Sequence, residues 1–206
     1  MSEATLLRQQ RKAETRNKLI VAAKELFEIQ GYEFTTLEGI ADRAGFHVQT
    51  LYRHFSSKIE LAAAGDETQL VHFRDAIRDE YREGSTIAFW RQYLGGLAHR
   101  VTDKDGGRSY RDVLHYELES PTVSFLLTRL SQEYKDLFSE SLEEDLDIED
   151  PEERQNTARL IAITLWGAHE YVMARYDQEF GIDLATESLA MIDRLEQLFG
   201  HLLKDT

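Results

Sequence analysis

The chain contains no cysteine and only two prolines among its 206 residues. The absence of cysteine excludes disulfide bonds, thiolate metal sites and a cysteine nucleophile. Because proline interrupts helices and strands, its scarcity favours long uninterrupted helices. No apolar run reaches the roughly 18 residues of a membrane span, and the start, MSEATLLRQQRK, lacks the apolar core of a signal peptide. We therefore expect a cytoplasmic protein that has no membrane partner.

The net charge of −14 is distributed unevenly along the chain. Residues 1–60 carry 9 basic and 8 acidic side chains, a net of +1, which leaves −15 for residues 61–206. The first 24 residues hold 6 basic and 2 acidic side chains. Because DNA binding requires a basic surface at one place rather than a basic chain, the overall acidity does not exclude it. Any contact with DNA is expected near the N-terminus.

Residues 35–58, TTLEGIADRAGFHVQTLYRHFSSK, have the pattern of two short helices separated by a tight turn. Thr35 and Glu38 have the spacing of a capping box, in which the two side chains satisfy the first N–H groups of a helix. Gly45 predicts the end of this helix, because glycine readily adopts the left-handed conformation that stops helices.

A second short helix is predicted for residues 48–54, with Leu51 and Phe55 facing inward. Ser57 and Glu60 form another capping box and predict the start of a third helix. Two short helices joined by a turn that contains glycine are typical of a helix-turn-helix. The second helix of that motif enters the major groove of DNA.

Residues 15–61 also contain a series of short elements at fixed spacings. They are Ala22-Ala23, Leu26-Phe27, Gly31-Tyr32, Thr35-Thr36, Ile40-Ala41, Ala44-Gly45, Thr50-Leu51-Tyr52, His54-Phe55 and Lys58. In these elements the segment resembles the DNA-binding domain of the TetR family of bacterial transcriptional regulators. It departs from the family at His47, Val48 and Gln49, where polar and small residues are common, and His47 is an unfavourable N-cap.

This resemblance implies an all-α protein of about nine helices. We expect a three-helix DNA-binding domain at residues 13–73, with the helix-turn-helix at about 36–55. A helical ligand-binding and dimerisation domain is expected to follow at residues 74–206. The implied function is a DNA-binding transcriptional regulator, most simply a repressor released from a palindromic double-stranded DNA operator by a small-molecule inducer. Neither catalysis nor a cofactor is expected.

The resemblance also implies which residues contact DNA. Contacts to phosphates are expected from Thr36, Tyr52, His54 and Lys58, and contacts to base edges from Val48, Gln49, Thr50 and Arg53, with His47 also facing the DNA. A glutamine can pair with adenine through two hydrogen bonds, and a valine can touch the methyl group of thymine.

Apolar periodicity and the two prolines predict the remaining helices. The first covers residues 14–30, with an apolar stripe that ends at Gly31. Pro121 and Pro151 follow Ser120 and Asp150, which suits proline at the first helical position behind a good N-cap. The later helices are expected at 57–81, 85–101, 109–118, 121–146, 151–177 and 184–203.

The last two predicted helices carry apolar residues on two faces. On the first of them Ala158, Ile161 and Leu165 form one stripe, while Leu160 and Ile163 lie off it. Two apolar faces indicate one for the core and one for a partner. We therefore expect a homodimer formed through about residues 151–203. Burial of both faces within one subunit is the alternative.

A small-molecule site is expected among the aromatic residues of the second domain. The candidate apolar contacts are Trp90, Tyr93, Phe125 and Trp166, and the candidate polar contacts are Arg111, His115 and His169. Such aromatic sets also occur in ordinary cores, so the site rests on the expectation that helices of this family surround a cavity.

The histidines and acidic residues allow two other interpretations, a metal site and a polar stripe. Asp112, His115 and Glu119 share one helical face, which is compatible with metal ligands, but the H-E-x-x-H signature is absent. A polar stripe is the simpler interpretation, so no metal site is predicted. No phosphate-binding loop or nucleophile motif occurs. The alternative function is a small-molecule sensor or a metal-dependent helical protein without DNA binding.

Overall fold

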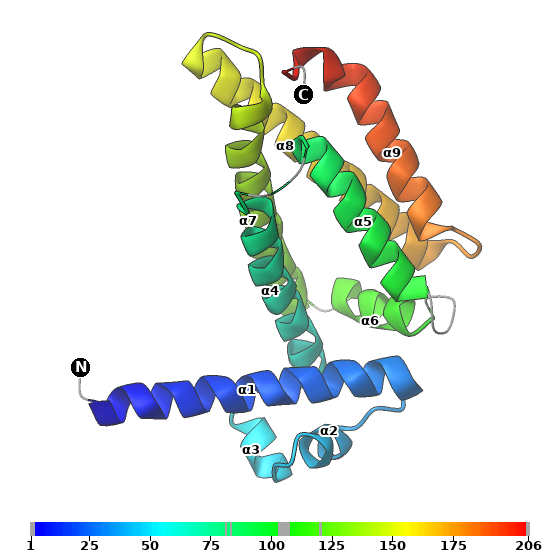
Figure 1. The fold of residues 1–206 in the computed structure, drawn as a ribbon. Coiled ribbons are helices and arrows are strands. Elements are labelled where there is room, and N and C mark those ends of the chain that lie inside the picture. The colour runs from blue at the N-terminus through cyan, green and yellow to red at the C-terminus, as the bar shows by residue number, and fades with distance from the viewer. Residues whose placement is uncertain (1–2, 81, 83, 103–107, 120, 205–206) are drawn as a thin grey trace. The chain divides into compact units, whose positions relative to one another are not determined.

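The computed structural model describes residues 3–80, 82, 84–102, 108–119 and 121–204 of the chain. These residues form nine α-helices and one short 3-10 helix, which confirms the predicted all-α class (Figure 1). None of the helices in these ranges has the length and apolarity needed to cross a membrane. The helices are α1 (Glu3–Gln30), α2 (Leu37–Arg43), α3 (Val48–Tyr52), α4 (Lys58–Ile77), α5 (Thr86–Thr102), α6 (Arg108–Glu119), α7 (Pro121–Asp145), α8 (Pro151–Gln178), α9 (Leu184–Phe199) and the 3-10 helix η1 (Gly200–Leu202).

The first helix begins at Glu3, eleven residues before the predicted start at residue 14. The sequence before Leu19 contains neither proline nor glycine, so nothing interrupts the helix. The apolar stripe marks only the part that is buried, and the pattern therefore underestimated the length. Gly31, with φ of +86°, ends α1 as predicted.

The N-cap of α2 is Thr36, and the prediction of a capping box at Thr35 and Glu38 was wrong by one residue. The Thr36 Oγ1 accepts a hydrogen bond from the Gly39 N–H at 3.0 Å. Thr35 is buried, and its hydroxyl donates to the carbonyl oxygen of Gly31 at 2.7 Å. Because that hydroxyl is engaged at the end of α1, the next threonine caps α2.

The predicted caps of α4 at Ser57 and of α8 at Asp150 are present, but the Glu60 carboxylate binds the N–H of Ser56 and not that of Ser57, which the predicted capping box requires. The Glu60 N–H donates to Ser57 Oγ at 3.2 Å, while the Glu60 carboxylate accepts from the Ser56 N–H at 2.6 Å. At α8, the Asp150 side chain accepts from the first free N–H groups behind Pro151. The equivalent cap predicted at Ser120 lies outside the described residues.

Contacts divide the chain into two compact units. The N-terminal unit comprises residues 1–68 and 107–126, and the C-terminal unit comprises residues 69–106 and 127–206. Helix α6 therefore belongs with the N-terminal helices, although it lies far from them in the sequence. The two domains expected from the sequence, 13–73 and 74–206, stay a prediction about how function is divided.

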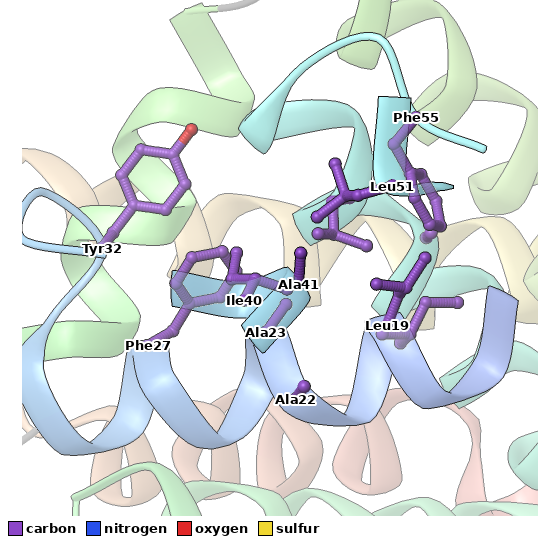
Figure 2. Close-up of a cluster of buried hydrophobic side chains, with 12 residues drawn as sticks. Leu19, Ala22, Ala23, Phe27, Tyr32, Ile40, Ala41, Leu51 and Phe55 are labelled. Atoms are coloured by element: carbon purple, nitrogen blue, oxygen red, sulfur yellow. The ribbon is translucent and has the colours of Figure 1, made fainter. Parts of the chain in front are cut away.

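The N-terminal unit is built around one apolar cluster. Figure 2 shows the side chains of Leu19, Ala23 and Phe27 on α1 facing the residues of the two following helices. Burying this stripe makes α1 the support on which α2 and α3 rest. The buried members are Leu19, Ile20, Ala22, Ala23, Phe27, Tyr32, Ile40, Ala41, Leu51, Phe55, Leu61 and Ala64.

The C-terminal unit is a bundle in which α9 packs along both α5 and α8. Its core is rich in aromatic side chains, and Phe73 lies at the centre with the rings of Tyr93 and Phe138 at 5.1 and 5.2 Å. Edge-on aromatic contacts of this kind add stability beyond the burial of apolar area.

Candidate functional site

The turn between α2 and α3 has the geometry of a helix-turn-helix. Gly45 has φ of +76°, and the following Phe46 N–H bonds to the Ala41 carbonyl oxygen at 2.8 Å. Only glycine adopts this backbone conformation without strain, so Gly45 fixes the direction in which α3 leaves the turn.

Helix α3 covers residues 48–52 and is shorter than the predicted 48–54, because the chain tightens into turns after Leu51. Contrary to the expectation of an unfavourable cap, His47 is the N-cap of α3. Its Nδ1 accepts a hydrogen bond from the Gln49 N–H at 3.4 Å, a long and weak contact. The extended backbone of His47 brings the imidazole nitrogen to the place where a serine oxygen usually acts.

The side chains of α3 differ in how far they are available for contact. His47, Gln49, Tyr52 and Arg53 are exposed, and Arg53 donates to Thr50 Oγ1 at 3.1 Å. Val48 is partly buried and packs against the apolar cluster of the N-terminal unit. Gln49 and Arg53 are therefore the long polar side chains that this helix presents, whereas Val48 is partly committed to the core.

His54 lies among basic side chains. Burial lowers the pKa of His54, and the positive charges of Lys12, Arg53 and Arg16 lower it further. Its Nδ1 is buried and, within the described part of the chain, has no hydrogen-bond partner. Arg16 is held in place by Glu67 at 3.1 Å and by the Phe55 ring, 5.0 Å from its guanidinium carbon. An anion here would meet several positive groups that now repel one another.

Lys58 contacts the backbone of the segment between α1 and α2. Its Nζ donates to the carbonyl oxygens of Tyr32 at 2.6 Å, Thr35 at 3.0 Å and Glu33 at 3.4 Å. The same ammonium lies over the Tyr32 ring, 4.2 Å from the centroid. The sequence pattern suggested only a phosphate contact, and no local signal pointed to these partners, which are more than 20 residues away.

In the C-terminal unit, four of the predicted ligand residues come together. Trp90, Tyr93, Trp166 and His169 belong to one aromatic cluster, in which the His169 ring lies 5.4 Å from Trp90 and 5.1 Å from Trp166. Burial lowers the pKa of His169 to about 4, so the imidazole is neutral at pH 7. Its Nδ1 is buried and lacks a hydrogen-bond partner among the described residues.

The other three predicted ligand residues lie in the N-terminal unit. Arg111 and His115 are on α6, and His115 is exposed. Phe125 is 78% exposed, so its expected role as an apolar wall gains no support. Sequence reasoning placed it inside because an aromatic residue in an amphipathic helix usually faces a core.

The polar stripe on α6 is not arranged as a metal site. Asp112, His115 and Glu119 lie in described parts of the chain, where no group of three or more histidine or acidic side chains is placed to hold a metal ion. The metal hypothesis therefore gains no support.

A sequence profile of bacterial regulatory proteins of the tetR family matches residues 19–64. This match covers the helices that form the apolar cluster and the helix-turn-helix. Residues 19–64 therefore form a DNA-binding domain of the TetR family. The matched segment begins at Leu19, where the buried stripe of α1 begins, and extends into α4.

Two known transcriptional regulators illustrate how the similarity is distributed. The chain is 52% identical over 56 residues to the HTH-type transcriptional regulator TcmR of Streptomyces glaucescens, which covers 27% of this chain and 25% of TcmR. It is 27% identical over 162 residues to the HTH-type transcriptional activator FasR of Mycolicibacterium smegmatis, covering 77% of this chain and 73% of FasR. The chain thus aligns with only a quarter of TcmR.

Solved structures of transcriptional repressors share the fold over most of the chain. The repressor FadR of Thermus thermophilus, in complex with lauroyl-CoA, has a TM-score of 0.60 at 22% identity and covers 93% of this chain and 97% of FadR. SmeT, the repressor of an efflux pump of Stenotrophomonas maltophilia, has a TM-score of 0.61 at 20% identity, covering 92% of this chain and 91% of SmeT. At such identities the likeness concerns the fold alone.

Proposed function

We propose that this TetR-family chain is a ligand-responsive, DNA-binding transcriptional regulator that acts in the cytoplasm. The observation that carries the proposal is the helix-turn-helix itself: α3 is braced by the buried Leu51 and presents exposed Gln49 and Arg53. A rigid helix with long polar side chains on its free face suits the major groove. The basic surroundings of His54 provide electrostatic attraction to phosphates.

Repression is the mode that we propose, with the inducer releasing the operator. The structurally similar FadR and SmeT are described as repressors. FasR is described as an activator, so the sign of regulation is a separate question. A reporter gene behind the bound promoter answers it, because deletion of the regulator raises expression under repression and lowers it under activation.

We further propose that the protein binds DNA as a homodimer through α8 and α9. Leu160 and Ile163 on α8 are 56% and 52% exposed, and Leu198 on α9 is 53% exposed. Because the opposite stripe, Ile161 and Leu165, is fully buried within the subunit, these helices have a second apolar face. A two-fold dimer would present two α3 helices to a palindromic operator.

The aromatic core of the C-terminal unit is the proposed site of the inducer. Trp90 and Trp166 offer apolar contact. The Nδ1 of His169 has no hydrogen-bond partner in the part of the chain that the structure describes, and it can accept a hydrogen bond from a ligand hydroxyl or amide. A mostly apolar molecule with a neutral polar group fits this environment better than an ion does. Helix α4 contributes Phe73 to this core and Leu61 to the other unit, so one helix links the two.

A gel-shift assay tests the proposal directly. The labelled probe is duplex DNA from immediately upstream of the protein's own gene, and the competitor is unlabelled random duplex of equal length. We expect a shifted band that survives the random competitor and disappears with excess unlabelled probe. A chain that binds neither this probe nor any sequence enriched from a random pool is not a DNA-binding regulator.

A further inference from the structure

We propose that Lys58 is a positioning residue for operator recognition, and that it joins the start of the helix-turn-helix to helix α6. We call Lys58, Tyr32, Glu33 and Tyr116 the Lys58 cluster. The inference rests on the proposed DNA-binding function and reassigns a lysine that the family resemblance implied would bind phosphate.

The donors of Lys58 are already occupied. An ammonium group has three N–H donors, and three backbone carbonyl oxygens, those of Tyr32, Glu33 and Thr35, lie within hydrogen-bonding distance, between 2.6 and 3.4 Å. A phosphate contact would have to replace one of these bonds while the ammonium also gave up the face of the Tyr32 ring. Lys58 therefore makes two short hydrogen bonds within the protein, to Tyr32 and Thr35, and a long, weak one to Glu33.

The carbonyl groups that Lys58 binds lead directly into the helix-turn-helix. They belong to the segment after Gly31, where the α-helical hydrogen bonds of α1 have ended, and before Thr36, which caps α2. Carbonyl oxygens in such a segment have no helical partners and gain from other donors, and that of Tyr32 also accepts from the Thr35 N–H at 3.3 Å. By binding them from the first residue of α4, Lys58 fixes where α2, and with it α3, begins.

Helix α6 contacts the same segment from another direction. The Tyr116 ring lies 4.7 Å from the Tyr32 ring, and the Tyr116 hydroxyl donates to Glu33 Oε1 at 2.7 Å. Tyr32, which lies at one end of the apolar cluster in Figure 2, thus has Lys58 and Tyr116 against its ring. Tyr32 and Glu33, which contact Tyr116, also supply two of the three carbonyl groups that bind Lys58.

This arrangement gives α6 a route to the DNA-reading helix that does not pass along α4. Both ends of α6 lead, along the chain, into the C-terminal unit, which holds residues 69–106 and 127–206. A displacement of α6 would pull on Tyr32 and Glu33, loosen the carbonyl groups from Lys58 and shift the start of α2. The Lys58 cluster would then convert a change in α6 into a change in operator preference.

The test measures operator and random-DNA affinities across a salt series, with the operator being the duplex that the wild-type protein enriches from a random pool. Lys58→Met removes the ammonium and keeps the stem, and Lys12→Met is the matched control at an exposed lysine. We expect Lys58→Met to lose at least about tenfold in preference for operator over random DNA, with an unchanged salt slope. Lys58→Arg should restore part of the preference. Lys12→Met should weaken both DNAs alike and reduce the slope by about 1.

Other outcomes would overturn the assignment. A reduced salt slope for Lys58→Met on both DNAs would make Lys58 a phosphate contact. A lowered melting temperature with unchanged preference would make its role merely structural. If circular dichroism shows that Lys58→Met does not fold, the variant Tyr116→Ala is measured instead. A reduced preference of Tyr116→Ala for operator over random DNA supports the cluster, and a preference equal to that of the wild type refutes it.

The cluster and the proposed function can also fail separately. If the wild-type protein enriches no DNA sequence, the proposed function fails, and hydrogen exchange still tests the cluster without DNA. Amides of α2 should exchange faster in Tyr116→Ala than in the wild type, whereas Tyr116→Phe, which loses only the bond to Glu33, should show a smaller effect. Identical exchange in all three proteins would exclude the route from α6.

Discussion

Asp66 on α4 and Glu117 on α6 place two carboxyl groups close together in the N-terminal unit. Burial raises the pKa of Glu117 well above its usual range, and the neighbouring Asp66 carboxylate raises it further. Burial also raises the pKa of Asp66 to about 7, opposed by Lys24 and aided by Glu67. Because Glu117 is buried and Asp66 is half-buried, these neighbouring carboxyl groups cannot both ionise cheaply, so one proton is retained near neutral pH.

The first prediction is that this pair makes stability fall as pH rises. Between the usual pKa of 3.8 and the raised value of about 7 for Asp66, the folded state binds more protons than the unfolded state. The stability that protonated Asp66 contributes is fully lost above about pH 7. Asp66→Asn should therefore be more stable than the wild type at about pH 8, by about 1–4 kcal/mol, with the gain shrinking toward pH 4.

Urea unfolding at several pH values measures this difference. Asp75→Asn is the control on the same helix, because Asp75 is exposed. A constant difference between Asp66→Asn and wild type across the pH range would contradict the proton-sharing pair.

His169 leads to a second prediction with the opposite sign. Its pKa is lowered by burial from 6.5 to about 4, so the unfolded state binds the proton more readily between these values. The stability that neutral His169 contributes is fully present above pH 6.5 and is lost as the pH falls toward about 4. His169→Leu should flatten this acid-side loss and raise the free energy of unfolding at pH 7 by about 1 kcal/mol, because a buried unpaired nitrogen is removed. A steeper acid-side loss in the variant, measured by urea unfolding, would show that His169 is charged in the folded protein.

The third prediction concerns base reading by Gln49. Gln49→Ala should change which base is preferred at one operator position, at a cost of about 1–3 kcal/mol for the wild-type sequence, and leave affinity for random DNA unchanged. Competition binding with operator variants at each position measures the preference. Equal loss on operator and random DNA would remove Gln49 from the reading surface.

The fourth prediction concerns the dimer. Leu160→Glu combined with Ile163→Glu should yield folded monomers that no longer bind a palindromic operator, because the exposed face of α8 becomes charged. The charges are placed there and not at Leu165, which is 0% exposed within the subunit and whose replacement would disturb the core. Sedimentation at micromolar concentration should show a wild-type dimer. A wild-type monomer under these conditions would refute the interface.

The sequence by itself determined the helices and the DNA-binding motif. The apolar stripe of α1, the glycines at residues 31 and 45 and the Asp150-Pro151 cap act over at most about four residues, so they can be read locally. Their spacing also carried the family resemblance, which the profile match to residues 19–64 confirmed.

Only the tertiary structure decided the partners of individual polar side chains. Thr35 and Thr36 are equally good caps by sequence, and the choice depends on which hydroxyl reaches the end of α1. The carbonyl groups that bind Lys58, the packing of α6 with α1 and the unpaired nitrogen of His169 all arise between residues distant in the chain. Hydrogen bonding and desolvation act through space, and local sequence patterns carry no information about which distant groups packing brings together.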